Sequence, residues 1–171
     1  MFITVEELLA RYQNGERNFA GISLASPTGI TQMLTDADLT GINLSGADLT
    51  GLRLERVNLS EAILTRSNFL DSVLIDVNLN HAELYKVNLR RCQGLYVDLS
   101  LAFMVQSNWV KTKILYSNLF YTNLEEAILI CSSLEGAMNT DPFRIGGAFA
   151  WHLTLPDGSL DEGPRFIDYP D

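Results

Sequence analysis

The sequence has few of the residues from which catalytic and metal sites are built. Its 171 residues include two cysteines and two histidines, and no CxxC pair occurs. His81 and His152 have no ligand-type neighbour three or four residues away, so a zinc site is not indicated. No glycine-rich phosphate loop is present, and the serine and aspartate residues recur periodically without a histidine partner. We therefore expect no enzyme activity, no metal, no cofactor and no small-molecule substrate.

Basic residues and long apolar runs are also scarce. There are 12 Lys and Arg residues against 21 Asp and Glu, a net charge of −9, which disfavours direct binding of nucleic acid. No apolar run approaches the roughly 18 residues that a membrane helix needs. Residues 1–10 lack the basic region of a signal peptide and contain Glu6 and Glu7. These absences predict a cytoplasmic protein that does not contact a membrane.

What the sequence does contain is a five-residue period. Of the 21 positions spaced by five from Leu34 to Leu134, 16 are leucine. The others are Phe69, Gly94, Met104, Trp109 and Ile114. A helix buries residues three and four apart and a strand buries every second residue, so neither explains this spacing. Short extended segments separated by tight turns do explain it, and four such segments close one square coil.

The string ADLTGINLSGADLTGLRL, residues 37–54, resembles the pentapeptide-repeat family, whose pattern is approximately A-(D/N)-L-x-x. The resemblance implies an all-β fold, a right-handed quadrilateral β-helix of five to six coils. We expect an N-terminal helical cap at 1–16, the repeat β-helix at 17–138, and a C-terminal cap and tail at 139–171. On the inward and outward alternation of the coil, Cys92 faces the interior and Cys131 faces outward, so the two should not form a disulfide.

Both ends carry signals of a cap. Residues 4–13 predict a helix, with Thr4 and Glu7 forming a capping box and Gly15 following its end. In the tail, Pro156-Asp157-Gly158 predicts a turn between two short strands. The tail also contains five large aromatic residues, namely Phe143, Phe149, Trp151, Phe166 and Tyr169.

Two stretches depart from the repeat. Residues 25–33, which include Pro27 and Gly29, interrupt the pattern, but its phase resumes unchanged at Leu34. This segment is either one irregular side of a coil or a loop outside it. Further on, Trp109 is too large for a position that leucine fills elsewhere. We interpret Gly94 and the adaptable Met104 as its compensation, rather than as parts of a cofactor pocket.

Asparagine or aspartate recurs every ten residues from Asn58 to Asn118, just before the central residue. This spacing predicts stacked amides on two opposite sides of the coil.

The outward positions of the later coils turn apolar, although nothing in the coil requires this. They predict a covered contact surface on two neighbouring corners. The candidate contact residues are Ile75, Leu95, Tyr96, Leu101, Leu115, Tyr116, Phe120 and Tyr121. The cover is the protein's own tail, a second copy in a homodimer, or a different protein.

Two functions are consistent with these features. The strings VEELLARYQNGERNFAGISL and TLPDGS are similar to those of cyanobacterial pentapeptide-repeat proteins, at least one type of which resembles a regulator of cell differentiation. That resemblance implies a rigid platform for protein–protein contact, with a partner that the sequence does not identify. The alternative is a mimic of DNA that modulates DNA gyrase or topoisomerase, as some family members do. It needs a continuous acidic surface, whereas five arginines lie along the repeats.

Overall fold

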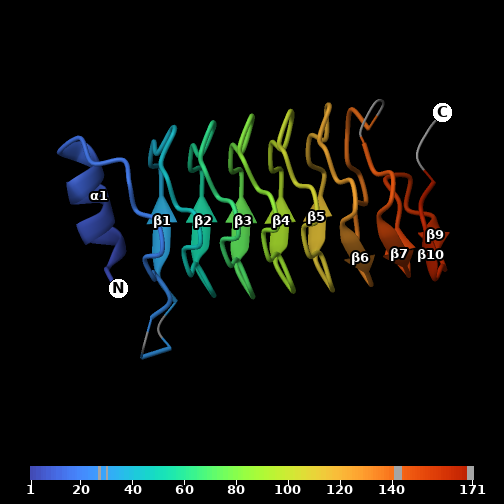
Figure 1. Ribbon diagram of the computed structural model, residues 1–171, viewed down its shortest axis with the longest axis horizontal. Coiled ribbons are helices and arrows are strands. Elements are labelled where there is room, and N and C mark those ends of the chain that lie inside the picture. The colour runs from blue at the N-terminus through green and yellow to red at the C-terminus, as the bar shows by residue number, and fades with distance from the viewer. Residues whose placement is uncertain (27, 30, 141–143, 169–171) are drawn as a thin grey trace.

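The protein is a straight rod of stacked coils with a helix across its N-terminal end (Figure 1). The computed structural model describes residues 1–26, 28–29, 31–140 and 144–168. Pro27, Phe143 and Tyr169, which the sequence analysis singled out, lie outside the described residues. Each coil contacts the coils before and after it, as in other solenoids. The predicted all-β solenoid is confirmed.

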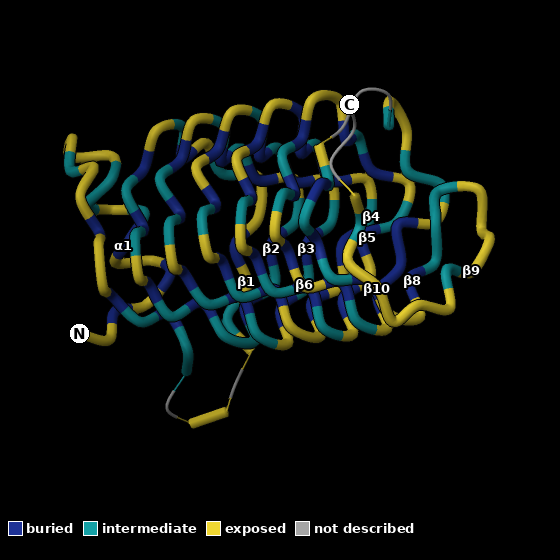
Figure 2. Tube along the Cα trace, turned by 45° about the vertical axis from the view of Figure 1, so that its right-hand side comes forward, coloured by how far each residue is buried: buried dark blue, intermediate teal, exposed yellow. Residues whose placement is uncertain are grey.

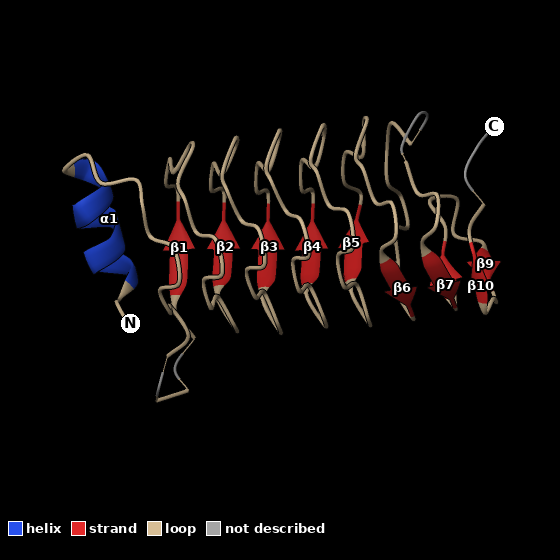
Figure 3. Ribbon diagram, viewed as in Figure 1, coloured by secondary structure: helices blue, strands red, loops and turns tan. Residues whose placement is uncertain are grey.

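One side of the rod is a five-stranded parallel sheet in chain order (Figure 3). Its strands are β1 (Met33–Thr35), β2 (Arg53–Glu55), β3 (Val73–Ile75), β4 (Gln93–Leu95) and β5 (Lys113–Leu115). Leu34 pairs with Leu54, and Leu54 with Leu74, so each leucine of this column stacks on the one in the next coil. Adjacent strands in a sheet lie about 4.8 Å apart, which sets the rise of each coil.

The other three sides pair through single bridges with the same offset along the chain. Three examples from one coil are Asn58↔Asn78, Ile63↔Glu83 and Asn68↔Asn88. With the sheet, these make four pairing sites per coil, each five positions after the last. The coil is therefore four-sided, as the five-residue period predicted.

The corners of the coil turn through left-handed backbone. At some corners of the first coils this position is glycine, with φ of +68° at Gly41 and +63° at Gly46, and at others it is Asp36 or Arg56, with φ of +51° and +53°. In later coils it carries a side chain, as at Tyr96 with φ +56° and Tyr116 with φ +51°. Left-handed backbone costs an L-residue about 1–2 kcal/mol. Side chains at these corners therefore stand where glycine would cost less.

The interior is filled by the leucines of the period and by the residue two positions before each, which is usually small or aliphatic. Buried residues recur along the successive coils in Figure 2. Burying one leucine contributes about 1.5–3 kcal/mol, so this interior is the main source of stability. Polar residues that point inward are mostly satisfied by the backbone: Ser72 Oγ donates to the Leu49 carbonyl at 2.9 Å. Ser132 Oγ is the one buried side-chain polar atom without a partner in the described part of the chain.

The sequence-based prediction paired Gly94 with the wrong residue: the side chain that fills the space at Gly94 is that of Ile114, not Trp109. A Cβ placed on Gly94 would lie 2.5 Å from Ile114 Cδ1 and 3.1 Å from Val97 Cγ2. Ile114 pairs with Gly94 in the sheet and stacks directly on it, whereas Trp109 lies on the neighbouring side. The Trp109 ring is fully buried, and its Nε1 donates to Ser107 Oγ at 2.7 Å.

The predicted amide ladders are present on two opposite sides. Asn88 Nδ2 donates to Asn68 Oδ1 at 2.7 Å on one side, and Asn118 Nδ2 donates to Asp98 Oδ1 at 3.0 Å on the other. Side-chain oxygens of the ladders also accept the backbone N–H two positions later, as Asn88 does from Arg90 at 3.2 Å. These side chains therefore hold the turns and join consecutive coils.

Helix α1 (Val5–Gln13) caps the N-terminal end and buries Val5 and Leu8 against the first coil. The Thr4 hydroxyl accepts from the Glu7 N–H, as predicted. The Glu7 carboxylate, expected to complete the capping box, instead lies 3.6 Å from Arg11. The backbone N–H of Glu6 and the Thr4 side chain lower the pKa of the Glu6 carboxylate.

The first coil is longer by five residues than the coil that follows it. Asn18 bridges Asn43 and Ser23 bridges Asp48, whereas Asn43 bridges Ile63 in the next coil. The described residues between Leu24 and β1 include a loop that projects from the rod near β1 (Figure 1). Gln32 closes its base: Nε2 donates to the Leu24 carbonyl at 2.5 Å, and Oε1 accepts from Val5 N at 2.9 Å. Of residues 25–33, Met33 begins β1, and the described residues before it form a loop outside the coil, which is the second of the two alternatives.

The parallel pairing continues beyond residue 138. The remaining strands are β6 (Ile128–Ile130), β7 (Phe149–Trp151), β8 (Leu153–Thr154), β9 (Leu160–Asp161) and β10 (Arg165–Phe166). β6 pairs with β7 in parallel, and β10 adds antiparallel to β7. β8 and β9 form the expected hairpin around Pro156-Asp157-Gly158. This end of the rod is closed by strands.

Candidate functional site

Tyr96 and Tyr116 occupy the same corner of consecutive coils. Their ring centroids lie 6.0 Å apart at 37°, and the two residues are 59% and 46% exposed. Gly136 is next in this column, and a Cβ there would collide with the Tyr116 ring. The tyrosines therefore form a short aromatic stack that ends against a bare backbone.

An apolar ridge runs beside this corner along β3, β4 and β5. It consists of the half-buried side chains of Ile75, Leu95 and Leu115. The ridge borders a shallow groove of about 320 Å³ on the face of the sheet, whose lining also includes Arg53 and Lys113. Three of the predicted contact residues thus lie side by side, one per strand.

The next corner carries Leu101, Phe120 and Tyr121. Phe120 and Tyr121 pack edge to face, with centroids 4.6 Å apart at 84°. All three residues are between 41% and 48% exposed. Tyr121 stacks on Leu101 because the two occupy the same position in consecutive coils.

The two corners flank one side of the rod, whose outward column holds Asp98 and Asn118. Asp98 Oδ1 also accepts from Ser100 N and Oγ, at 2.9 and 2.6 Å, so this carboxylate is held in place. The structure therefore brings the eight predicted residues to one side and its two borders. We call Tyr96, Leu101, Tyr116, Phe120 and Tyr121, together with this column, the aromatic side.

Sequence reasoning missed two exposed residues at the edge of this surface. Met138 bridges to Asn118 in the same outward column and is 55% exposed. Phe103 lies on the neighbouring side, and its ring centroid is 6.3 Å from that of Tyr85. The signal for Met138 was available, since it follows Asn118 by one full coil.

The described tail leaves this surface open. Residues 144–168 extend the end of the rod through β7 to β10, and the tyrosines keep the exposure given above. Of the three covers considered for these corners, the protein's own tail is therefore not observed within the described residues.

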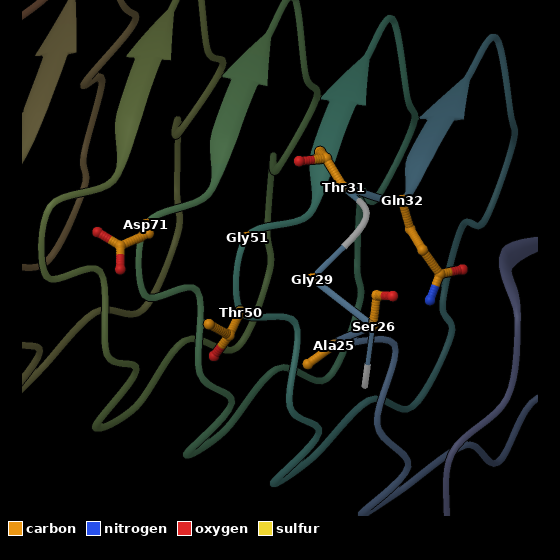
Figure 4. Close-up of a pocket in the computed structure, with 8 residues that line it drawn as sticks. All are labelled: Ala25, Ser26, Gly29, Thr31, Gln32, Thr50, Gly51 and Asp71. Atoms are coloured by element: carbon orange, nitrogen blue, oxygen red, sulfur yellow. The ribbon is translucent and has the colours of Figure 1, made fainter.

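A second depression lies at the base of the N-terminal loop (Figure 4). It measures about 280 Å³ and is lined mostly by small polar residues, among them Ser26, Thr31 and Gln32. The one carboxylate in this lining, Asp71, is bound to Arg91, whose hydrogen bonds lower the pKa of Asp71. The residues of this lining do not form a nucleophile–base pair.

The remaining reactive groups are dispersed. Cys92 is buried, which raises the pKa of its thiol to about 12, whereas Cys131 is exposed and both are free. Within the described ranges, no three His, Cys, Asp or Glu side chains are placed to hold a metal ion. The same residues include no helix with the length and apolar character to cross a bilayer.

Known proteins share this architecture. The family description "Pentapeptide repeats (8 copies)" matches residues 33–66 and 53–91. No curated protein sequence matches the chain.

Three solved structures illustrate the likeness. HetL, a pentapeptide repeat protein involved in heterocyst differentiation regulation from the cyanobacterium Nostoc sp. strain PCC 7120, is 21% identical. The match covers 93% of this chain and 100% of HetL, with a TM-score of 0.43. QnrB1, a plasmid-mediated fluoroquinolone resistance protein, is 15% identical over 77% of this chain and 70% of its own, with a TM-score of 0.57. Rfr23 from the cyanobacterium Cyanothece 51142 is 19% identical over 84% and 94%, with a TM-score of 0.38.

At these identities the solved structures bear on the fold alone. The QnrB1 match supports the coiled architecture, and the family match falls on the most regular repeats. Residues 33–91 therefore match the pentapeptide-repeat family model, and the four-sided coil and the five-residue leucine period continue the same repeat along the rod.

Proposed function

We propose that this protein is a non-enzymatic, rigid platform for protein–protein contact, and that a protein partner docks on the aromatic side. The observation that carries the proposal is the exposure of five large apolar side chains on one stretch of the rod. Aromatic residues are enriched at protein interfaces, where they contribute much of the binding energy. The outward positions of a solenoid have no packing role that would demand them.

Most of these side chains stand at the corners of the coil. Four of the five side chains stand on left-handed backbone, with φ between +51° and +59°, namely Tyr96, Leu101, Tyr116 and Tyr121. Glycine occupies the equivalent corners at 41, 46 and 51. The same left-handed position carries polar side chains at other corners, such as Arg66 and Lys86, so what sets these four side chains apart is their apolar character.

The platform is preorganised for binding. The backbone at the tyrosine corner is hydrogen-bonded to the following coil, so docking orders little beyond side chains. For example, Tyr96 N donates to the Leu115 carbonyl at 3.1 Å and Tyr116 N to the Glu135 carbonyl at 3.0 Å. A rigid surface loses less conformational entropy on binding than a mobile one.

Charge weighs against the alternative, a DNA mimic that modulates gyrase. Such a mimic needs rows of free carboxylates, but two of those on the rod are neutralised by arginines one coil away. Arg56 binds Asp36 at 2.6 and 2.8 Å, and Arg91 binds Asp71 at 2.5 and 2.6 Å. We therefore favour the contact platform.

The test is affinity purification from the native cell with three tagged forms: the natural chain, a Tyr96→Asp/Tyr121→Asp double variant, and Ile128→Asp as control. Aspartate tolerates left-handed backbone better than tyrosine does, so the double variant should remain folded. Ile128 is 40% exposed and stands on the opposite side of the rod.

We expect a stoichiometric partner, or a homodimer detected by light scattering, to be lost with the double variant and kept with the control. Unchanged partners and oligomeric state in all three forms would refute the proposal.

A further inference from the structure

Charge is segregated around the middle of the rod. Between residues 57 and 140 the six cationic residues are Arg66, Lys86, Arg90, Arg91, Lys111 and Lys113. All six fall on the half of each coil that runs from the corner of Arg66 to the strand of Lys113. Over the same residues, six of the eight carboxylates stand on the other half, namely Glu61, Asp76, Glu83, Asp98, Glu125 and Glu135.

Five of these cations border a single side. Residues 66–71, 86–91 and 106–111 stack through the bridges Asn68↔Asn88↔Asn108, and we call them the cationic side. Sides that are two apart in a four-sided coil lie opposite each other. The cationic side is therefore on the far face of the rod from the aromatic side.

Most of this positive charge is not neutralised. Asp71 is the one carboxylate on the cationic side, and it is bound to Arg91. Lys86 lies over the ring of Tyr85, 5.0 Å from its centroid. Arg66, Arg90 and Lys111 are exposed and make no side-chain hydrogen bond or ion pair with any described residue.

Stacking like charges on one another destabilises the protein, and nothing in the fold requires it. Arg66 lies directly beneath Lys86, and Arg91 beneath Lys111, each one coil apart at about 4.8 Å between backbones. Like charges placed opposite each other destabilise a pair of strands. A local cluster of cations on a chain of net charge −9 attracts an anionic partner.

We propose that the cationic side docks an acidic polypeptide segment, as a second contact surface independent of the aromatic side. The half-buried side chains of Leu70 and Val110 lie beside the cations and offer apolar contact to such a segment. Phe69 and Trp109, the two aromatic residues within the cationic side, are buried, and the half-buried ring of Tyr85 at its border is stacked with Phe103. Binding of single-stranded nucleic acid relies on exposed aromatic residues, so the burial of these two rings favours the polypeptide.

The experiment measures fluorescence anisotropy of labelled deca-glutamate with the full chain at 50 and 150 mM salt. The test variant is Arg90→Gln/Lys111→Gln. The matched control is Arg144→Gln/Arg165→Gln, which removes the same charge from exposed ion pairs outside the cationic side. Deca-glutamine and an oligothymidylate of equal charge serve as comparison ligands.

We expect deca-glutamate to bind more tightly than either comparison ligand, and the test variant to weaken it about fivefold or more, given two lost ion pairs. The control should stay within about twofold. Equal loss in both variants, absence of binding at 50 mM salt, or tighter binding of the oligothymidylate would each overturn the proposal.

Discussion

Gly94 is the position where the packing of the rod can be tested most directly. A Cβ there would approach Ile114 Cδ1 to 2.5 Å and Val97 Cγ2 to 3.1 Å. Ile114 Cδ1 is the end of a side chain that can rotate, so Gly94→Ala should cost about 1 kcal/mol, the low end for overpacking of a core. Gly94→Leu inserts three further carbons into a filled interior and should cost about 3 kcal/mol or more.

A double-mutant cycle identifies which residue fills the space. Ile114→Val removes Cδ1, so combined with Gly94→Ala it should recover most of the loss, giving a coupling of about 1 kcal/mol. Trp109→Leu should give no such recovery, because the Trp109 ring is not among the atoms nearest to Gly94.

The assay is urea unfolding followed by circular dichroism, with thermal melts as a second measure. A change of about 1 kcal/mol shifts the melting temperature of a domain of this size by about 2–4 °C. Additive effects of Gly94→Ala and Ile114→Val would refute the assignment of Ile114 as the filler. Recovery of stability by Trp109→Leu would instead support the prediction made from the sequence, that Gly94 makes room for Trp109.

Single contacts give three further predictions. Thiol titration at pH 8 should detect one reactive thiol per native chain, the exposed Cys131, and two after unfolding, because burial raises the pKa of Cys92 to about 12. Two reactive thiols in the native state would contradict this burial. Gln32→Leu should destabilise the N-terminal cap by about 1–3 kcal/mol, since both backbone partners of the amide lose a hydrogen bond; unchanged amide exchange in α1 would argue against this link. Arg91 lowers the pKa of Asp71, so the pair stabilises the fold above the ordinary aspartate pKa, and this stabilisation is lost as the pH falls through the lowered pKa. The free energy of unfolding of an Arg91→Gln variant should therefore depend less on acid pH at low salt. An identical pH profile of the variant and the natural chain would exclude the contribution.

The five-residue period was sufficient to predict the coil, because every inward position repeats the same demand for an apolar side chain. It could not predict where the solenoid continues past residue 138. Asn123 pairs with Arg144 and Ile128 with Phe149, so the chain between partners is one position longer than in the earlier coils. This insertion shifts the phase, and the pattern vanishes from the sequence while the pairing persists.

For a related reason, Ile114 was not identified from the sequence as the residue that fills the space at Gly94. Sequence neighbours at five-residue spacing lie on adjacent sides, whereas direct stacking needs a comparison one full coil away. The contact surface was accessible to prediction because outward residues of one column recur once per coil, and Tyr96 and Tyr116 follow that spacing. Its partner is not encoded in the column, since exposure of a side chain does not specify what covers it.

The two proposed surfaces lie on opposite sides of a rod whose sides are fixed by the same ladders of backbone hydrogen bonds. The described coils between them form one continuous stack, and coupling between distant sites needs an element with two arrangements. Their binding free energies should therefore add. Tyr96→Asp/Tyr121→Asp should leave the affinity for deca-glutamate within about twofold, and Arg90→Gln/Lys111→Gln should leave capture by the aromatic side unchanged. If either double variant weakened binding at the other side, the rod would have to transmit a conformational change.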